Sequence, residues 1–204
     1  MRRLYYITHA DVVIDPDVPV PDWGLSERGK ARHVAFARRC PPVASVFCSM
    51  ERKAREGAAI LAEAQGLVPR EVLSLAENDR SATGYLPGPE FEAMADAFFA
   101  NPRDTVRGWE RAIDAQYRVV ATLKRLVAEA PEGDIAVVAH GGIGALFRAH
   151  LTGAGIDRSH DQPRGAGGNL LVVGTPGQGE ADDGAWCLLR DWTAIDSFEA
   201  EAGA

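Results

Sequence analysis

The segment from Asp134 to Ala139 constrains the fold more than any other, because every residue in it after the aspartate is apolar. A short apolar run such as Ile135-Ala136-Val137-Val138-Ala139 is typical of a β-strand. A strand without polar alternation has both faces covered, as central strands of parallel sheets do. The sequence therefore predicts a sheet with this segment near its centre and helices on both faces.

Other segments alternate between strand-like and helix-like patterns. Further strands are expected at 4–8, 43–48, 71–75, 169–173 and 186–190, and helices at 27–40, 50–64, 90–100, 105–130 and 141–151. Ser26 and Ser49 are expected to cap the first two of these helices, and Gly66 to end the second. This order predicts an α/β fold, a three-layer sandwich with a mostly parallel sheet. The last two strands are expected to form an antiparallel edge joined by a hairpin loop at 174–184. A single domain is expected over 1–198, with a disordered tail at 199–204.

Composition excludes several classes of protein. Lys and Arg total 22 against 29 Asp and Glu, a formal net charge of −7, which argues against a nucleic-acid binder. The longest apolar stretches fall far short of the roughly 20 residues that a membrane span needs, and the run after Arg2 and Arg3 is too short for a signal peptide. With three cysteines, Cys40, Cys48 and Cys187, no disulfide framework is expected. We therefore expect a cytoplasmic protein with free buried thiols and no membrane partner.

Two histidines directly follow predicted strands: His9 comes after the first and His140 after the most apolar one. The carboxyl ends of parallel strands lie at one edge of a sheet, so the two imidazoles are expected to converge. Gly141 and Gly142 let the backbone approach a ligand, and the helix after them offers its amides to an anion. The other histidines are expected to be structural or solvated: His33, His150 and His160.

Five short motifs occur in order along most of the chain. They read Tyr6-Ile7-Thr8-His9-Ala10, Leu25-Ser26-Glu27-Arg28-Gly29, Cys48-Ser49 followed by Lys53-Ala54-Arg55-Glu56-Gly57-Ala58, Leu75-Ala76-Glu77, and Val137-Val138-Ala139-His140-Gly141-Gly142. In this order and spacing the chain resembles the histidine phosphatase superfamily, in its phosphoglycerate-mutase-like branch. The resemblance spans about Leu4 to Trp192 and implies the three-layer fold.

The resemblance also implies roles for individual residues. His9 would be the nucleophile and take up a phosphoryl group as phosphohistidine, which suits a neutral imidazole near neutral pH. His140 would contact the phosphoryl oxygens, with Gly141 beside it at the phosphate. Glu77 would protonate the leaving oxygen and later help to activate water. Asp79 takes the place of Glu77 as the acid if the register slips by two residues.

The chain departs from the family pattern where phosphate is bound. The arginine before the nucleophile is Thr8, the following glycine is Ala10, and the second arginine aligns with Lys53. A hydroxyl and an ammonium cannot reproduce the bidentate, charged contacts of guanidinium groups. Arg52 is next to Lys53, but a helix turns about 100° per residue, so its side chain should face elsewhere.

Two explanations of these departures remain open. Arg80, three residues after Glu77 in the irregular segment, enters the site and supplies the missing charge. Alternatively, the site has lost its chemistry and only binds an anion.

The resemblance implies a phosphoric monoester hydrolase that acts through a phosphohistidine on a small phosphorylated metabolite. Its partners would be that substrate or inorganic phosphate, with a homodimer as a further possibility. The alternative is a catalytically impaired phosphate-binding relative with a regulatory or ligand-binding role. No cofactor is expected, and no metal, since the chain has no His pair at i,i+4 and no H-x-E pattern.

Overall fold

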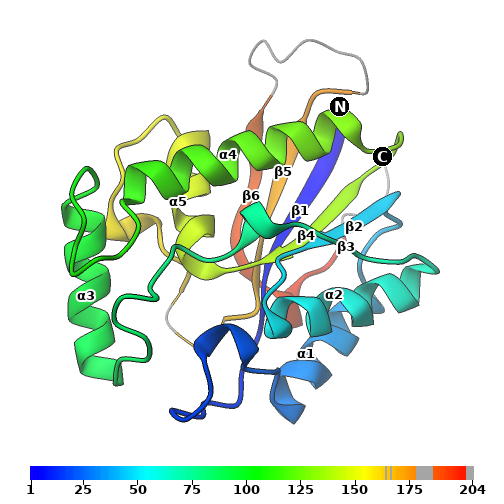
Figure 1. Ribbon diagram of the computed structural model, residues 1–204. Coiled ribbons are helices and arrows are strands. Elements are labelled where there is room, and N and C mark those ends of the chain that lie inside the picture. The colour runs from blue at the N-terminus through cyan, green and yellow to red at the C-terminus, as the bar shows by residue number, and fades with distance from the viewer. Residues whose placement is uncertain (164, 166, 178–185, 201–204) are drawn as a thin grey trace.

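Six strands form one mixed sheet in the computed structural model, which describes residues 1–163, 165, 167–177 and 186–200 (Figure 1). The strand order is β3-β2-β4-β1-β5-β6, with bounds β1 Arg2–Thr8, β2 Ser45–Cys48, β3 Arg70–Glu71, β4 Ile135–Ala139, β5 Asn169–Thr175 and β6 Cys187–Ala194. The first four pair in parallel, while β5 and β6 are antiparallel. The predicted α/β fold with a mostly parallel sheet is thus confirmed, with β4 in its interior.

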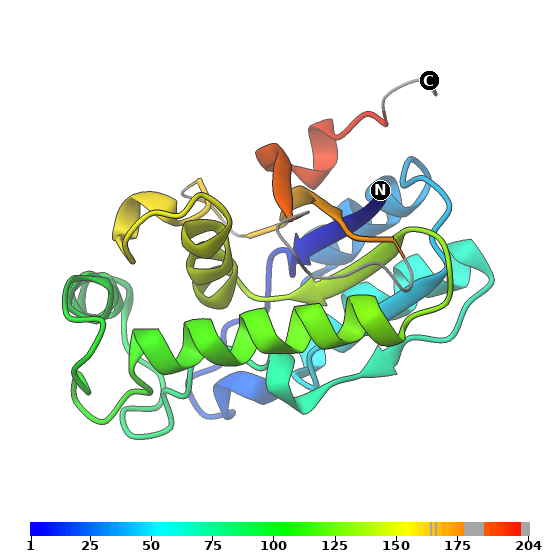
Figure 2. The same ribbon diagram turned by 90° about the horizontal axis from the view of Figure 1, so that it is seen from above.

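Helices cover both faces of the sheet (Figure 2). Their bounds are α1 Glu27–Ala37, α2 Arg52–Gln65, α3 Gly88–Ala100, α4 Ala112–Glu129 and α5 Gly141–Leu151. Side chains of β1 alternate between two cores, as strand geometry requires. Tyr5 and Ile7 pack with α1 and α2, whereas Leu4 and Tyr6 pack with α4 and α5.

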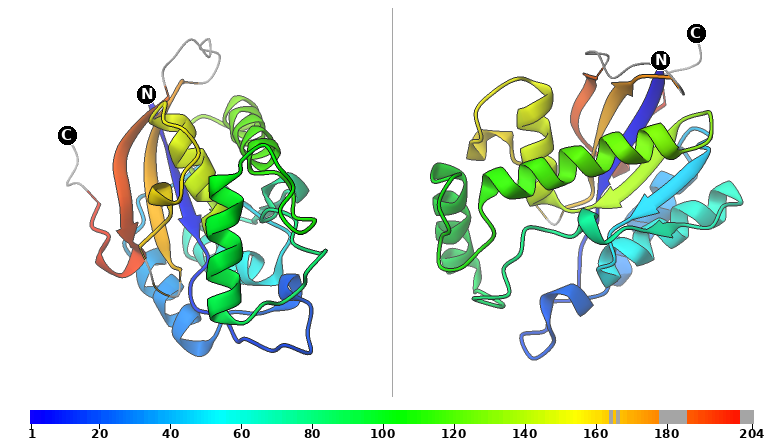
Figure 3. Two further views of the ribbon diagram at one scale, coloured as in Figure 1. Left: turned by 90° about the vertical axis from the view of Figure 1, so that its left-hand side faces the viewer. Right: turned by 45° about the horizontal axis from the view of Figure 1, so that its top comes forward.

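A third apolar cluster joins α3 to the first turn of α4 and the middle of α5, so α3 stands beside the sandwich, away from the strands (Figure 3). Phe98 and Trp109 are buried at its centre. The segment between Leu75 and α3 is irregular, as expected, and lies at the sheet edge where β1 and β4 end.

Two predicted elements are shorter in the structure than expected. The strand at 71–75 is reduced to Arg70–Glu71, followed by the 3-10 turn Leu73–Leu75. The helix at 105–130 begins only at Ala112, because Arg107 and Gly108 have positive φ angles of 47° and 83° that no α-helix allows.

The second helix has a different cap from the one predicted. Glu51, not Ser49, is the N-cap residue of α2, and the hydroxyl of Ser49 accepts a hydrogen bond from Glu51 N at 3.2 Å. The predicted Ser26 cap of α1 and Gly66 end of α2 are confirmed; Ser26 Oγ accepts from Gly29 N at 3.1 Å.

Most of the predicted hairpin loop, at 178–184, lies outside the described residues, as do residues 201–204 of the tail. The domain boundary at 198 therefore stays a prediction. Cys40 and Cys48 are buried and free as expected, but Cys187 is exposed. Within the described part of the chain, no helix has the length and apolarity that a membrane span requires.

Candidate active site

The two strand-end histidines meet at the carboxyl edge of the sheet. β1 and β4 are neighbours in register, Thr8 opposite Ala139, and His9 N donates to the carbonyl of Ala139 at 3.0 Å. The rings of His9 and His140 consequently lie edge to face, with centroids 5.3 Å apart. The predicted convergence of these imidazoles is confirmed.

The hydrogen bond of His9 defines its tautomer. Its Nδ1 lies 3.0 Å from the carbonyl oxygen of Ala10, an atom that can only accept, so Nδ1 carries the proton. Burial, with further contributions from the charges of His140 and Lys53, lowers the pKa of His9 from 6.5 to about 3. The ring is therefore neutral at pH 7 and has an unprotonated Nε2.

His140 is completely buried, and its two ring nitrogens differ. Nε2 lies 2.8 Å from Ser49 Oγ and 3.3 Å from Glu51 Oε1. Nδ1 is buried without a hydrogen-bond partner among the described residues. Burial lowers the pKa of His140, although the carboxylates of Glu51 and Glu77 act in the opposite direction.

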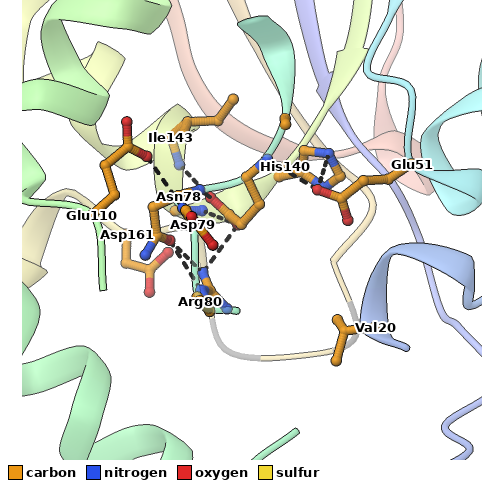
Figure 4. A network of polar contacts seen from close by, with 12 residues as sticks. Val20, Glu51, Asn78, Asp79, Arg80, Glu110, His140, Ile143 and Asp161 are labelled. Carbon is orange, nitrogen blue, oxygen red and sulfur yellow. Dashed lines mark hydrogen bonds and ion pairs between the residues drawn. The ribbon is translucent and has the colours of Figure 1, made fainter. Parts of the chain in front are cut away.

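Glu77 lies at the N-terminus of α5, in contact with Ile143 and Arg80, which Figure 4 labels in the polar network of the site. Its Oε2 accepts from Gly142 N and its Oε1 from Ile143 N, each at 3.0 Å. A side chain at Gly142 would place its Cβ 2.7 Å from the Glu77 carboxylate, so the glycine provides the space for this contact. Burial by itself would raise the pKa of Glu77, but Arg80, His140 and the Gly142 amide outweigh it and lower that pKa.

Arg80 faces Glu77 across the same loop. Its Nη2 lies 3.2 Å from Glu77 Oε2, and its Nε and Nη2 donate to Asn78 Oδ1 at 3.0 and 2.8 Å. The guanidinium carbon also lies 4.9 Å from the ring centroids of both Phe91 and Trp109. These contacts hold the cation beside Glu77, where the compensation hypothesis needs it; its binding of phosphate stays a prediction.

Asp79 points elsewhere. Its Oδ1 accepts from Ser81 N at 2.8 Å, and this backbone hydrogen bond lowers the pKa of Asp79. Of the two candidate acids, Glu77 is the one that contacts the helix following His140. The geometry therefore favours Glu77, and its role as the acid stays a prediction.

Thr8 is buried, and its hydroxyl is engaged on the side of β5. It donates to Gln162 Oε1 at 2.8 Å and accepts from Asn169 N at 2.9 Å. A hydroxyl has one proton to donate, and Gln162 receives it. Thr8 thus ties β1 to the segment before β5, and its assignment as a phosphate ligand stays a prediction.

Lys53 is buried and has two oxygen partners. Its Nζ forms an ion pair with Glu51 Oε2 and donates to the carbonyl of Val20 at 2.9 Å. Arg52 instead lies on the exposed side of α2, paired with Glu56 at 2.8 Å, as the helical rotation predicted. The assignment of Lys53 to phosphate stays a prediction, like that of Gly141, which begins α5.

Glu51 is the residue that the sequence analysis missed. Its Oε1 accepts from Glu77 N at 3.0 Å and lies 3.3 Å from His140 Nε2, while Oε2 pairs with Lys53. Burial would raise the pKa of Glu51, but His140 and Lys53 outweigh it and lower this pKa to about 2. The one available signal was an acid two residues before Lys53, at the start of a predicted helix.

A cavity of about 630 Å³ lies next to the site, on the α4 side of the loop that carries Glu77. Glu77 borders it, but neither His9 nor His140 does. Arg118, also in its wall, donates to the carbonyls of Ser74 and Ala76 at 2.9 Å each. It thereby fixes the backbone leading to Glu77.

The charges near the two histidines balance. Lys53 and Arg80 contribute two positive charges, Glu51 and Glu77 two negative ones, and both imidazoles are neutral at pH 7. Among the described residues, no group of three or more His, Cys, Asp or Glu side chains is placed to hold a metal ion. The arrangement offers a nitrogen nucleophile, a carboxylate and an unpartnered imidazole nitrogen around one point.

Comparison with known proteins adds independent information. The profile of the histidine phosphatase superfamily (branch 1) matches residues 16–179, a range that includes Glu77 and His140 and begins after His9. No curated protein sequence matches the chain.

Solved structures match over nearly the whole chain. A mycobacterial glucosyl-3-phosphoglycerate phosphatase in complex with VO3 is 26% identical, with a TM-score of 0.72 over 95% of this chain and 100% of that one. The complex of the same phosphatase with inorganic phosphate is 24% identical, with a TM-score of 0.74 over 96% of this chain and 99% of that one. YhfR of Bacillus stearothermophilus is 18% identical, with a TM-score of 0.76 over 93% and 96%. A putative α-ribazole-5′-P phosphatase of Escherichia coli is 16% identical, with a TM-score of 0.68 over 95% of this chain and 97% of that one.

Proposed function

Because the chain belongs to branch 1 of the histidine phosphatase superfamily, we propose that it is a metal-independent phosphomonoesterase that acts through phospho-His9. One observation carries the proposal. The Nδ1 proton of His9 is held by the Ala10 carbonyl, which leaves Nε2 as a free nucleophile, and His140 lies beside it with an unpartnered Nδ1. A nucleophile and an oxygen-binding group side by side are what phosphoryl transfer requires.

The reaction proceeds in two displacements. His9 Nε2 attacks phosphorus, the ester P–O bond breaks, and Glu77 gives a proton to the leaving oxygen. Water then attacks the phosphohistidine, Glu77 takes its proton, the N–P bond breaks and phosphate departs. His140 and Arg80 donate hydrogen bonds to the phosphoryl oxygens, where charge is spread in the transition state.

Glu77 must be protonated before the first displacement, although its pKa is lowered in the free protein. The negative charge of the arriving phosphate group would raise the pKa of Glu77 again. A like charge beside a carboxylate raises its pKa, and a phosphate group against Arg80 would also compete for the cation that now stabilises ionised Glu77. Substrate binding thus converts Glu77 into an acid.

We assign a small phosphorylated metabolite as the substrate class. Support comes from the named activities of the structural relatives, which are phosphatases of glucosyl-3-phosphoglycerate and of α-ribazole 5′-phosphate. The cytoplasmic location and a homodimer stay predictions.

A phosphate-binding relative without turnover is the second candidate. Two contacts favour it: the hydroxyl proton of Thr8 is donated to Gln162, and the charge of Lys53 is neutralised by Glu51. Both positions at which the family pattern has arginine would then contribute little charge to the site.

Hydrolysis of a generic aryl phosphate by the wild-type protein and by His9→Ala separates the two candidates. We expect turnover to fall on the order of 10³-fold or more in the variant, since removing a catalytic nucleophile has effects of at least that size. His150→Ala, an equal truncation at an exposed position of α5, is the matched control and should retain wild-type activity. Equal turnover by wild type and His9→Ala, with phosphate still bound, would establish the binding protein instead.

A further inference from the structure

Glu51 contacts a buried cation, a backbone amide and one of the two histidines of the site. Its carboxylate contacts Lys53 Nζ, Glu77 N and His140 Nε2, and it remains ionised because these groups keep its pKa low. The side chain is largely buried, so water does not replace these contacts. A carboxylate that touches His140 but points away from its free nitrogen acts on the site through His140.

The contacts of Nε2 decide which nitrogen of neutral His140 carries the proton. Ser49 Oγ, at 2.8 Å, can donate or accept, so it is compatible with either tautomer. Glu51 Oε1, at 3.3 Å, can only accept, and an unprotonated Nε2 would place a lone pair against a carboxylate. Glu51 therefore selects the tautomer with the proton on Nε2.

This choice leaves the other nitrogen unprotonated. Nδ1 is buried, has no hydrogen-bond partner in the described part of the chain, and lies in the ring that faces His9. In the tautomer fixed by Glu51, Nδ1 presents a lone pair. A lone pair repels the oxygen of an anion, so neutral His140 cannot bind a phosphoryl oxygen.

We propose that Glu51 is a positioning residue that keeps one proton of His140 on Nε2, so that the site must take up a second proton, on Nδ1, when it binds a tetrahedral oxyanion. The balance is one neutral His140, one dianion and one proton from solvent, giving an imidazolium that donates from Nδ1 to the anion and from Nε2 to Glu51. The inference rests on the proposed phosphate site but not on its turnover.

The charged groups that face His140 act in opposite directions on a second proton. Glu51 and Glu77 stabilise the imidazolium, whereas Lys53, Arg80 and burial disfavour it in the free protein. His9, from the end of β1, also opposes a second charge. A bound dianion offsets the charges of Lys53 and Arg80. Glu51 and Glu77 then stabilise the second proton on His140.

Sulfate is the probe, because it has no ester to hydrolyse and carries no proton of its own near neutral pH. Isothermal titration calorimetry in two buffers of different ionisation enthalpy counts the protons taken up. For wild type we expect about one proton per sulfate, with affinity falling toward tenfold per pH unit as pH rises from 6 to 8. His9→Ala should retain this uptake, which assigns the proton to His140 and not to the nucleophile.

Glu51→Met removes the charge and both acceptor oxygens at nearly constant volume. Ser49 can then donate to Nε2, so Nδ1 carries the proton before any anion arrives. Proton uptake should fall to near zero and the affinity for sulfate should become independent of pH. Glu51→Asp should restore part of the coupling, and Glu63→Met, the same change at an exposed position of α2, should leave it intact.

A measurement on the wild-type protein covers the case in which Glu51→Met fails to fold. Imidazole ¹⁵N shifts of the free protein at pH 7.5 should place the proton of His140 on Nε2. A proton on Nδ1, sulfate binding without proton uptake, uptake unchanged in folded Glu51→Met, or no sulfate binding at millimolar concentration would each overturn the proposal. If the wild-type protein binds sulfate with proton uptake but does not hydrolyse an aryl phosphate, only the proposed activity is overturned.

Discussion

The guanidinium of Arg80 forms an ion pair with Glu77, 3.2 Å between Nη2 and Oε2, and its carbon lies 4.9 Å from the ring centroids of both Phe91 and Trp109. Arg80 and Glu77 come from one short loop, and Glu77 accepts hydrogen bonds from the first amides of α5, directly after His140. This pairing joins the cation and the acid of the proposed reaction, so each can be tested through the other.

Arg80→Ala should weaken phosphate binding and slow aryl phosphate hydrolysis on the order of 10²- to 10³-fold, because one oriented, charged donor is lost. Inhibition by inorganic phosphate and steady-state kinetics measure the two effects. Arg111→Ala is the control, since Arg111 forms an exposed pair with Asp114. Wild-type kinetics and phosphate affinity in Arg80→Ala would exclude compensation by this residue.

Glu77→Gln should lose activity according to how much the leaving group needs a proton. For an alkyl phosphate we expect a loss of about 10²- to 10⁴-fold, the usual range for a general acid, and a smaller loss for an aryl phosphate with an acidic phenol. The measurement is kcat for a series of leaving groups. Asp79→Asn should stay near wild type, because Asp79 bonds Ser81 N instead of facing α5; the reverse pattern would move the role to Asp79.

Thr8→Val keeps the shape of the side chain and removes its hydroxyl. It should lower the free energy of unfolding by about 1–3 kcal/mol, because Gln162 and Asn169 N lose a buried partner. Urea unfolding measures this change. Phosphate affinity should change much less than in Arg80→Ala; an equal loss would instead make Thr8 a direct phosphate ligand.

His33 should make the protein less stable in acid. Burial lowers its pKa from 6.5 to about 4, so between pH 4 and 6.5 the unfolded chain binds more protons than the folded one. Stability therefore falls as pH falls through this range. His33→Gln should reduce the slope of unfolding free energy against pH by about 1.4 kcal/mol per unit, one proton's worth.

Unfolding in urea at several pH values tests this slope, with His150→Gln as the exposed control. The glutamine oxygen can keep the bond that His33 Nε2 accepts from Ala10 N at 3.2 Å. An unchanged slope would mean that His33 is charged in the folded protein.

Much of the architecture was predictable because it depends on local patterns. The apolar run before His140 predicted an interior strand, and Ser26 and Gly66 marked a helix start and a helix end that the structure confirms. Predictions failed where pairing with a neighbouring element determines the local structure. Glu71 to Leu75 reads as a strand, but only Arg70 and Glu71 pair with β2.

The candidate site divides in the same way. That His9 and His140 meet follows from two strand ends and the parallel rule, so the sequence by itself determined it. The sequence also offered Arg80, three residues after Glu77, as a cation for the site, but it left open whether that side chain enters the site or faces solvent. The contacts with Glu77, Phe91 and Trp109 decide this.

Only the tertiary structure decided what each polar group faces. Thr8 bonds a glutamine 154 positions away, Glu51 reaches His140 across 89 positions, and Lys53 finds Val20 and Glu51 instead of open space. Such contacts depend on the packing of loops against strand ends, where sequence patterns have no period. Since burial strengthens electrostatic interactions, the pKa values of Glu51 and His140 depend on burial and on partners that only the folded chain brings together.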